Sequence, residues 1–203
     1  MKLLVIDDNE DDFVLLRERL DQLGQFDFEL LHEADPLAAL DRVRAEAPAV
    51  VLLDYRLGPT DGVELLKQMR GAGLLQPVIV LTGQGDEYVA AEITRAGADA
   101  YLMKDDLDND RLAKALDLAV ARAREAGEDQ AQRSETLDKL QTLTPREREV
   151  LDEIVAGLTN KQIAAKMHRS IETIKVHRAH IMAKVQADST ADLVRRVVTA
   201  RLG

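Results

Sequence analysis

Residues 49–54, Ala-Val-Val-Leu-Leu-Asp, decide the fold, because a short apolar run ends there in a single acidic residue, Asp54. Similar runs recur at 3–6, 78–81 and 100–103. The polar residues that follow these runs are Asp7 with Asp8, Thr82, and Lys104. Short apolar runs bounded by turns are typical of buried strands in a parallel sheet. Ligands bind at the carboxyl ends of such strands, so we expect these polar side chains to meet at one sheet edge.

Apolar runs alternate with segments of helical spacing from residue 1 to about residue 124. The predicted strands are 2–7, 27–32, 49–54, 77–82 and 100–103, and the predicted helices are 11–23, 36–46, 61–72, 86–96 and 108–122. This alternation is typical of right-handed βαβ units. The predicted fold is therefore an α/β flavodoxin-like, doubly wound, five-stranded parallel sheet of order 2-1-3-4-5.

From residue 143 the pattern is helical only. Thr144-Pro145-Arg146-Glu147 combines an N-cap, a proline at the first helical position and a capping-box glutamate. Other capping residues precede three further helical segments, so the predicted helices are 145–156, 160–167, 171–185 and 190–200. We predict an all-α four-helix domain whose two middle helices form a helix-turn-helix.

The charge of the chain is divided unevenly along its 203 residues. The net charge of −10 combines −12 over residues 1–125, −2 over residues 126–142 and +4 over residues 143–203. We therefore expect an acidic domain at 1–122, a polar linker at 123–142 that could be partly helical, and an anion-binding domain at 143–203. There are no cysteines, which excludes disulfides and thiolate chemistry. Without a signal segment or an apolar stretch of about 18 residues, we expect a cytoplasmic protein with no membrane partner.

The three carboxylates of Asp7, Asp8 and Asp54 would repel one another at the predicted sheet edge. A divalent cation relieves that repulsion, and oxygen ligands without Cys or His favour Mg²⁺ over zinc. A carboxylate beside Mg²⁺ can act as a nucleophile and become an acyl phosphate. The ammonium of Lys104 would stabilise the added charge, and the Thr82 hydroxyl would bond a phosphoryl oxygen. The predicted chemistry is phosphorylation of an aspartate.

Residues 1–122 resemble a CheY-like receiver domain of two-component response regulators. The matching pieces are Val5-Ile6-Asp7-Asp8, Leu52-Leu53-Asp54, Asp61-Gly62, Leu81-Thr82-Gly83 and residues 97–104. The resemblance implies that Asp54 accepts a phosphoryl group from a histidine kinase or phosphotransfer protein. It implies that Asp8, Asp54 and the Arg56 carbonyl hold Mg²⁺, with Asp7 helping through water.

The same resemblance implies roles for the residues around the acceptor. Thr82 and Tyr101 would be paired switch residues, and Lys104 would face the phosphate. Arg56 and Gln84 would tune the lifetime of the phosphoryl group.

Two positions depart from the receiver pattern. Gly58 stands where the family usually has proline, and Pro59 follows it. Lys104 is followed by Asp105 instead of a proline whose peptide bond is typically cis. A cis bond before any other residue costs roughly 2.5–4 kcal/mol. The sequence therefore leaves open how Lys104 is aimed at the phosphate.

Residues 159–184 carry six Lys or Arg side chains against one acidic residue, Glu172. Helical spacing predicts one apolar face, made of Ile163, Met167, Ile171, Ile174, Ile181 and Val185. Residues on or near the opposite face are available to a DNA major groove: Lys175, Val176, Arg178 and Ala179.

Residues 143–203 also resemble a LuxR-type (FixJ/NarL-type) DNA-binding domain. The signature lies in 143–151, 157–164 and 173–177. The resemblance implies that Lys175, Val176 and Ala179 face bases. It implies phosphate contacts from Asn160, Lys161, Thr173, His177 and Lys184. The last helix would form the dimer contact through Leu193, Val194 and Val197.

The predicted function is a DNA-binding transcriptional response regulator that is switched by phosphorylation of Asp54 and is a homodimer when active. It is not an enzyme, apart from slow loss of its own phosphoryl group. One alternative is a phosphorylation-independent DNA-binding regulator whose receiver is only a protein-interaction module. Two further alternatives are an aspartyl-phosphate hydrolase or phosphate sink, which the DNA-binding signature makes secondary, and a ligand-sensing quorum regulator, which the N-terminal half disfavours.

Overall fold

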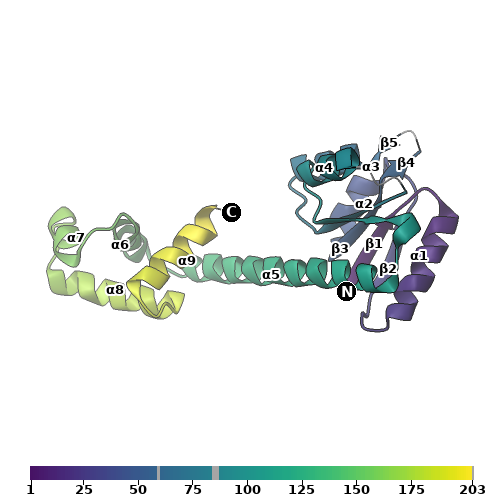
Figure 1. The fold of residues 1–203 in the computed structure, drawn as a ribbon. Helices are drawn as coiled ribbons and strands as arrows, with labels where there is room; N and C mark the ends of the chain where they lie inside the picture. The colour runs from purple at the N-terminus through teal and green to yellow at the C-terminus, as the bar shows by residue number, and fades with distance from the viewer. Residues whose placement is uncertain (59, 84–86, 203) are drawn as a thin grey trace. The chain divides into compact units, whose positions relative to one another are not determined.

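The computed structural model of the chain describes residues 1–58, 60–83 and 87–202 (Figure 1). The chain divides into two compact units, Met1–Glu125 and Ala126–Gly203. Among the described residues, no helix is both long and apolar enough to span a membrane.

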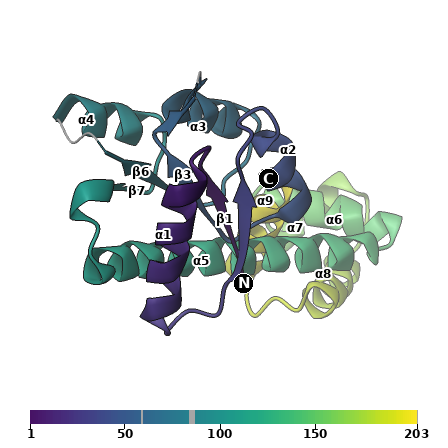
Figure 2. The same cartoon turned by 90° about the vertical axis from the view of Figure 1, so that its right-hand side faces the viewer.

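The N-terminal unit is a five-stranded parallel sheet with helices on both faces (Figures 1 and 2). Its strands are β1 (Lys2–Ile6), β2 (Glu29–Glu33), β3 (Val50–Asp54), β6 (Val78–Thr82) and β7 (Ala100–Met103). The order is β2-β1-β3-β6-β7. Since β6 and β7 are the fourth and fifth strands of this sheet along the chain, the predicted order 2-1-3-4-5 is confirmed.

Two apolar cores form because successive side chains of a strand point to opposite faces of the sheet. The helices are α1 (Glu10–Leu23), α2 (Ala39–Glu46), α3 (Gly62–Gly71), α4 (Glu87–Arg95) and α5 (Asn109–Gln141). Leu52 packs in the core that includes α1 and α5, and Leu53 packs in the core that includes α2, α3 and α4. The central strand β3 is buried along its whole length, which explains its continuous apolar run.

Two features of the N-terminal part differ from the prediction. A two-stranded antiparallel sheet, β4 (Arg56–Leu57) and β5 (Thr60–Asp61), follows the acidic end of β3. Strands of two residues are too short to produce a periodic pattern. Helix α5 extends past the predicted helix end at residue 122 to Gln141, so the segment 123–142, expected as a linker that could be partly helical, is helical nearly throughout, and the boundary between the units falls within α5. Residues 119–126 are rich in strong helix formers, and Gly127 lowers the stability of the helix by only about 1 kcal/mol relative to alanine.

In the described part of the C-terminal unit, four helices follow residue 143, as predicted. They are α6 (Pro145–Val155), α7 (Asn160–Lys166), α8 (Ile171–Val185) and α9 (Thr190–Leu202). Thr144 and Thr159 form capping boxes at the starts of α6 and α7. The core joins all four helices and includes Ile163, Ile174, Ile181, Val185 and Leu193. Ile171 departs from the predicted apolar face, because its side chain at the start of α8 is exposed.

Candidate functional site

Three carboxylates meet at the carboxyl edge of the N-terminal sheet. Asp7 and Asp8 follow β1, and Asp54 is the last residue of β3. One carboxylate oxygen from each of the three residues lies within 4.8 Å of the other two. Asp7 and Asp54 are buried, with exposed fractions of 1% and 6%, whereas Asp8 is open to solvent. This set of oxygens, partly buried and with an open side, suits a hard divalent cation such as Mg²⁺.

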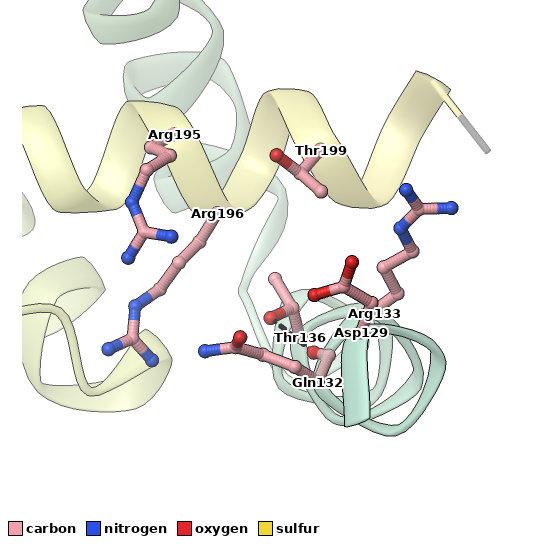
Figure 3. A pocket seen from close by; sticks show the side chains of 7 residues that line it. All are labelled: Asp129, Gln132, Arg133, Thr136, Arg195, Arg196 and Thr199. Atoms are coloured by element: carbon pink, nitrogen blue, oxygen red, sulfur yellow. Dashed lines mark hydrogen bonds between the residues drawn. The ribbon is translucent and has the colours of Figure 1, made fainter. Parts of the chain in front are cut away.

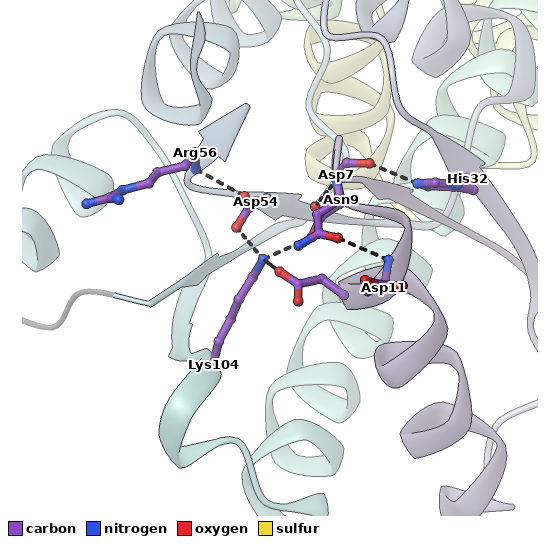
Figure 4. Close-up of polar contacts among 8 residues, drawn as sticks. Asp7, Asn9, Asp11, His32, Asp54, Arg56 and Lys104 are labelled. Carbon is purple, nitrogen blue, oxygen red and sulfur yellow. Dashed lines mark hydrogen bonds and ion pairs between the residues drawn. The ribbon is translucent and has the colours of Figure 1, made fainter. Parts of the chain in front are cut away.

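Lys104 reaches the same cluster from the turn that follows β7 (Figure 4). Its Nζ lies 2.8 Å from Asp54 Oδ1, 3.0 Å from Asp7 Oδ2 and 2.8 Å from Asp12 Oδ2. All peptide bonds in the described ranges are trans, and that between Lys104 and Asp105 is one of them. Lys104 therefore reaches the acidic cluster without the proline of the family pattern.

The two buried carboxylates are each oriented by a backbone amide. Asp7 Oδ1 accepts from the Asn9 amide at 2.9 Å, and Asp54 Oδ2 accepts from the Arg56 amide at 3.2 Å. In both residues the other oxygen faces Lys104 (Figure 4). His32 Nε2 lies 2.9 Å from the Asp7 carbonyl oxygen, where it can act only as the donor. Backbone amides that follow the strands and ion pairs with Lys104 therefore both fix the orientation of these carboxylates.

The site carries more negative than positive charge, because the one ammonium of Lys104 contacts three carboxylates, those of Asp7, Asp12 and Asp54. Burial raises the pKa of Asp54, and the hydrogen bond and charge of Lys104 oppose that rise only in part. Burial alone would lower the pKa of Lys104, but hydrogen bonds to Asp12, Asp54 and Asp7 raise it above its ordinary value. Lys104 stays cationic at neutral pH and cannot neutralise all of its acidic neighbours. The remaining negative charge favours a bound cation.

Two glycines allow the chain to turn closely around the acceptor. A Cβ on Gly62 would lie 2.1 Å from the Asp54 carbonyl oxygen, so a larger residue would displace the backbone. Asp61 caps α3 at this point by accepting from the Val63 amide at 2.8 Å. Gly58, which replaces the proline of the family pattern, has a left-handed φ of 55°, which favours glycine. Pro59 and Gln84 lie outside the described residues.

The two predicted switch residues differ strongly in exposure. Thr82 ends β6 with 1% of its surface exposed, at the same sheet edge as Asp54. Tyr101 lies on the neighbouring strand β7, paired in register with Val80, and is 43% exposed. Their switch role and the metal role of the Arg56 carbonyl stay predictions.

Comparisons with known proteins identify both halves of the chain. The family model of the response regulator receiver domain matches residues 3–117. That of the bacterial regulatory proteins of the luxR family matches residues 141–197. The chain belongs to the response regulators with a LuxR-type domain. It is 35% identical over 198 residues to the transcriptional regulatory protein FixJ of Bradyrhizobium diazoefficiens, and this match covers 98% of this chain and 95% of FixJ.

Two solved structures resemble this response regulator over both of its domains. The low-resolution structure of the response regulator StyR is 29% identical, with a TM-score of 0.75 and 97% of each chain covered. Full-length FixJ from B. japonicum is 34% identical, with a TM-score of 0.57, and the match covers 100% of this chain and 98% of FixJ.

The LuxR-type domain presents part of the predicted DNA surface to solvent. Lys175, Val176 and Ala179 are exposed on α8, and Lys161 is exposed on α7. The other phosphate candidates on these helices are half-buried: Asn160, Thr173 and His177. These assignments to bases and phosphates stay predictions.

Two basic residues of the predicted DNA surface have partners on other helices of the domain, and a third, Lys175, pairs with Glu172 of its own helix at 3.2 Å. Arg178 donates to Asn160 Oδ1 at 2.9 Å and also to the Thr190 hydroxyl, so it links α8 to α7 and α9. Lys184 donates to Glu147 Oε2 at 2.7 Å and to the Thr142 carbonyl at 3.3 Å. Helical spacing could not reveal these bonds, because their partners lie on other helices or, for Thr142, in the turn between α5 and α6. Arg178 and Lys184 are thus bound within the fold and less available to DNA than expected.

The expected dimer contact on α9 needs correction. Leu193 and Val197 are fully buried in the core of their own domain. Their side chains are therefore absent from the surface that a second copy could touch. Val194 is half-buried and packs at the margin of this core, so it alone of the three stays a candidate contact.

A small polar pocket lies between α9 and residues 129–136 of α5 (Figure 3). Arg195 and Arg196 line it, but both pair with Asp192, at 2.6 and 2.7 Å. Arg133 points away from these two guanidinium groups in Figure 3. The positive charges therefore do not converge as an anion site would require.

Proposed function

We propose that a partner histidine kinase or phosphotransfer protein phosphorylates Asp54, and that phosphorylation controls binding of the LuxR-type domain to DNA. The main support is the contact of Lys104 with the buried Asp54 carboxylate at the sheet edge, at 2.8 Å. A cation opposite a nucleophilic carboxylate stabilises the charge of a transferred phosphoryl group. The LuxR-type domain in the same chain gives that modification an output.

The proposed reaction is a single phosphoryl transfer. An Asp54 carboxylate oxygen attacks the phosphorus of a phosphohistidine, so that a P–O bond forms and the P–N bond breaks. The departing imidazole nitrogen takes up a proton. Mg²⁺, when bound by the carboxylates of Asp7, Asp8 and Asp54 and the Arg56 carbonyl, would neutralise charge on the phosphoryl oxygens. Slow attack of water on the same phosphorus would release phosphate and restore the carboxylate.

The acyl phosphate changes the interactions at the sheet edge. Lys104 exchanges an Asp54 oxygen for a phosphoryl oxygen, and the Thr82 hydroxyl turns toward the new group. Tyr101 then changes position on the exposed side of β7. Because these contacts differ between the two forms, they bias a pre-existing equilibrium of the receiver domain. The favoured form dimerises and places α8 in the major groove of DNA in the cytoplasm.

The alternative is a DNA-binding regulator that does not respond to phosphorylation. The replacement of the proline after Lys104 by Asp105 permits this alternative. With Asp105 in place, Lys104 Nζ still lies 2.8 Å from Asp54 Oδ1. That geometry favours the phosphorylated regulator over the alternative.

Phosphorylation should tighten binding to target DNA. Genomic fragments selected by the acetyl-phosphate-treated protein should bind the treated chain about 5- to 150-fold more tightly than the untreated chain, the usual range of coupling between sites. Titration of one selected fragment measures the ratio. Treated and untreated Asp54→Asn should bind it equally. Equal affinities for the wild-type chain would support the phosphorylation-independent alternative.

Two exposed lysines should separate base recognition from phosphate binding. Lys175→Ala should lower affinity for a selected fragment by roughly 1–3 kcal/mol, with a smaller loss on random DNA, as expected of a base contact. Lys161→Ala should weaken binding to both DNAs and reduce the slope of log affinity against log salt by about 1. Salt titrations with both DNAs provide the measurement. An equal loss on both DNAs for Lys175→Ala would make it a phosphate contact.

A further inference from the structure

One face of α1 holds the segment that carries Lys104. The three contacts are Lys104 Nζ to Asp12 Oδ2 at 2.8 Å, Arg19 to the Leu107 carbonyl, and Asn109 Nδ2 to Gln22 Oε1 at 3.2 Å. Positions 12, 19 and 22 are seven and three residues apart, a spacing that lines them along one side of a helix. Helix α1 therefore supports this segment from residue 104 to residue 109.

The segment that α1 holds includes Asp105, which stands where the family pattern has a proline. A proline after Lys104 would fix φ at about −65° and stiffen the turn. Asp105 has no such constraint. The lysine side chain is itself a flexible four-carbon stem. Other contacts must therefore hold the ammonium at the acceptor.

Asp12 differs from the other two carboxylates that contact Lys104. Asp7 and Asp54 belong to the cluster that could hold a metal ion, and Asp54 is also the proposed acceptor. A metal ion and a phosphoryl group would both draw on these two residues. Asp12 lies in the first turn of α1, and 36% of its side chain is exposed. It belongs neither to the metal cluster nor to the acceptor, so its contact with Lys104 can persist when a metal ion and a phosphoryl group are bound.

We propose that Asp12 is a positioning residue that aims Lys104 at the phosphoryl group on Asp54. The inference rests on the proposed function, because it names how this chain prepares the cation for that transfer. When the Asp54 oxygen becomes bonded to phosphorus, Lys104 loses one of three acceptors. A phosphoryl oxygen takes that place while Asp12 keeps the ammonium at the site.

The sign of the effect separates this role from a simple charge effect. Asp12 adds negative charge near an anionic phosphoryl group, and by repulsion alone it would slow the transfer. As the anchor of Lys104, it speeds the transfer. Removing Asp12 therefore slows labelling if it positions the lysine and accelerates labelling if it only repels the donor.

The test measures the initial rate at which acetyl phosphate with Mg²⁺ labels the full chain, read as added mass. A P–O bond to Asp54 forms as the P–O bond to acetate breaks and acetate leaves. Asp12→Ala should slow labelling about tenfold, since small misplacements of a positioned group are costly. In the Lys104→Ala background it should cause no further slowing. Asp11→Ala, which removes an exposed carboxylate from the same helical turn, should leave the rate within about twofold.

A second readout follows the contact without phosphorylation. In ¹H–¹⁵N spectra of the untreated chain, amide signals of residues 104–109 should shift in Asp12→Ala and stay in place in Asp11→Ala. Faster labelling, unchanged labelling, or equal slowing in both Lys104 backgrounds would overturn the positioning role. A wild-type chain that acetyl phosphate does not label on Asp54 would instead contradict the proposed function. The contact would then be judged by the amide signals, and unshifted signals would overturn it.

Discussion

Asp54→Asn should abolish labelling of the full chain by acetyl phosphate in the presence of Mg²⁺. The amide has nearly the size of the carboxylate, but it lacks the nucleophilic oxygen that forms an acyl phosphate. Mass spectrometry of the intact chain should show one added phosphoryl group on the wild type and none on the variant. The label should be lost on treatment with hydroxylamine, which cleaves acyl phosphates.

The Asp54→Asn variant should keep its fold, so loss of label can be assigned to chemistry. Burial raises the pKa of Asp54 above its ordinary value. For an acid, a raised pKa in the folded state means that ionisation at neutral pH opposes folding. A neutral amide at this position therefore removes an unfavourable charge. Denaturant unfolding should show a receiver domain at least as stable as the wild type.

Asp11→Asn is the matched control for this substitution. It removes an exposed carboxylate near the site, in the first turn of α1, and should retain the label. Labelling of Asp54→Asn to the wild-type extent would show that another side chain is the acceptor. It would remove the basis of the proposed function.

The central part of the fold could be predicted because local pattern and tertiary environment agree there. The strand β3 is buried on both sides and reads as an unbroken apolar run that ends at Asp54. Parallel strands place their carboxyl ends at one edge, so the meeting of Asp7, Asp8 and Asp54 followed from topology alone. The antiparallel pairing of β4 with β5 could not be predicted, because strands of two residues are too short to show an apolar run in the sequence.

Contacts between distant elements could not be predicted from spacing. The bond from Asp12 to Lys104 joins residues 92 positions apart, and that from Lys184 to Glu147 joins residues 37 apart. Helical spacing places a side chain on a face but does not say what covers that face. Leu193 and Val197 illustrate this point, because an apolar stripe on α9 suits a dimer contact and a core equally well. In this structure both side chains pack in the core of their own domain.

Glu147→Gln should destabilise the LuxR-type domain by about 3 kcal/mol at neutral pH. Glutamine can still close the capping box with Thr144, so the substitution mainly removes charge. Glu147 is 4% exposed, and Lys184 and the Thr144 amide lower its pKa from 4.5 to about 2. A shift of this size corresponds to about 3 kcal/mol, at roughly 1.4 kcal/mol per pH unit. Glu149→Gln, on the exposed side of α6, should change stability by less than about 1 kcal/mol.

The destabilisation should depend on pH in one direction. Because the pKa of Glu147 is lower in the folded state, its contribution is complete above about pH 4.5 and is lost as the pH falls toward 2. The wild type and Glu147→Gln should therefore differ most at neutral pH and converge near pH 2. At pH 2 about half of the Glu147 side chains are protonated even in the folded protein, so most of the stability difference between the two proteins is already lost there.

Denaturant unfolding of the full chain can assign the effect to one domain. The three tyrosines, Tyr55, Tyr88 and Tyr101, all lie in residues 1–125, so tyrosine fluorescence follows the receiver domain alone. Far-ultraviolet circular dichroism follows the helices of both domains. Glu147→Gln should shift the dichroism of the LuxR-type domain and leave the tyrosine transition in place. A loss no larger than that of Glu149→Gln, or one that persists at pH 2, would show that this buried ion pair does not stabilise the domain.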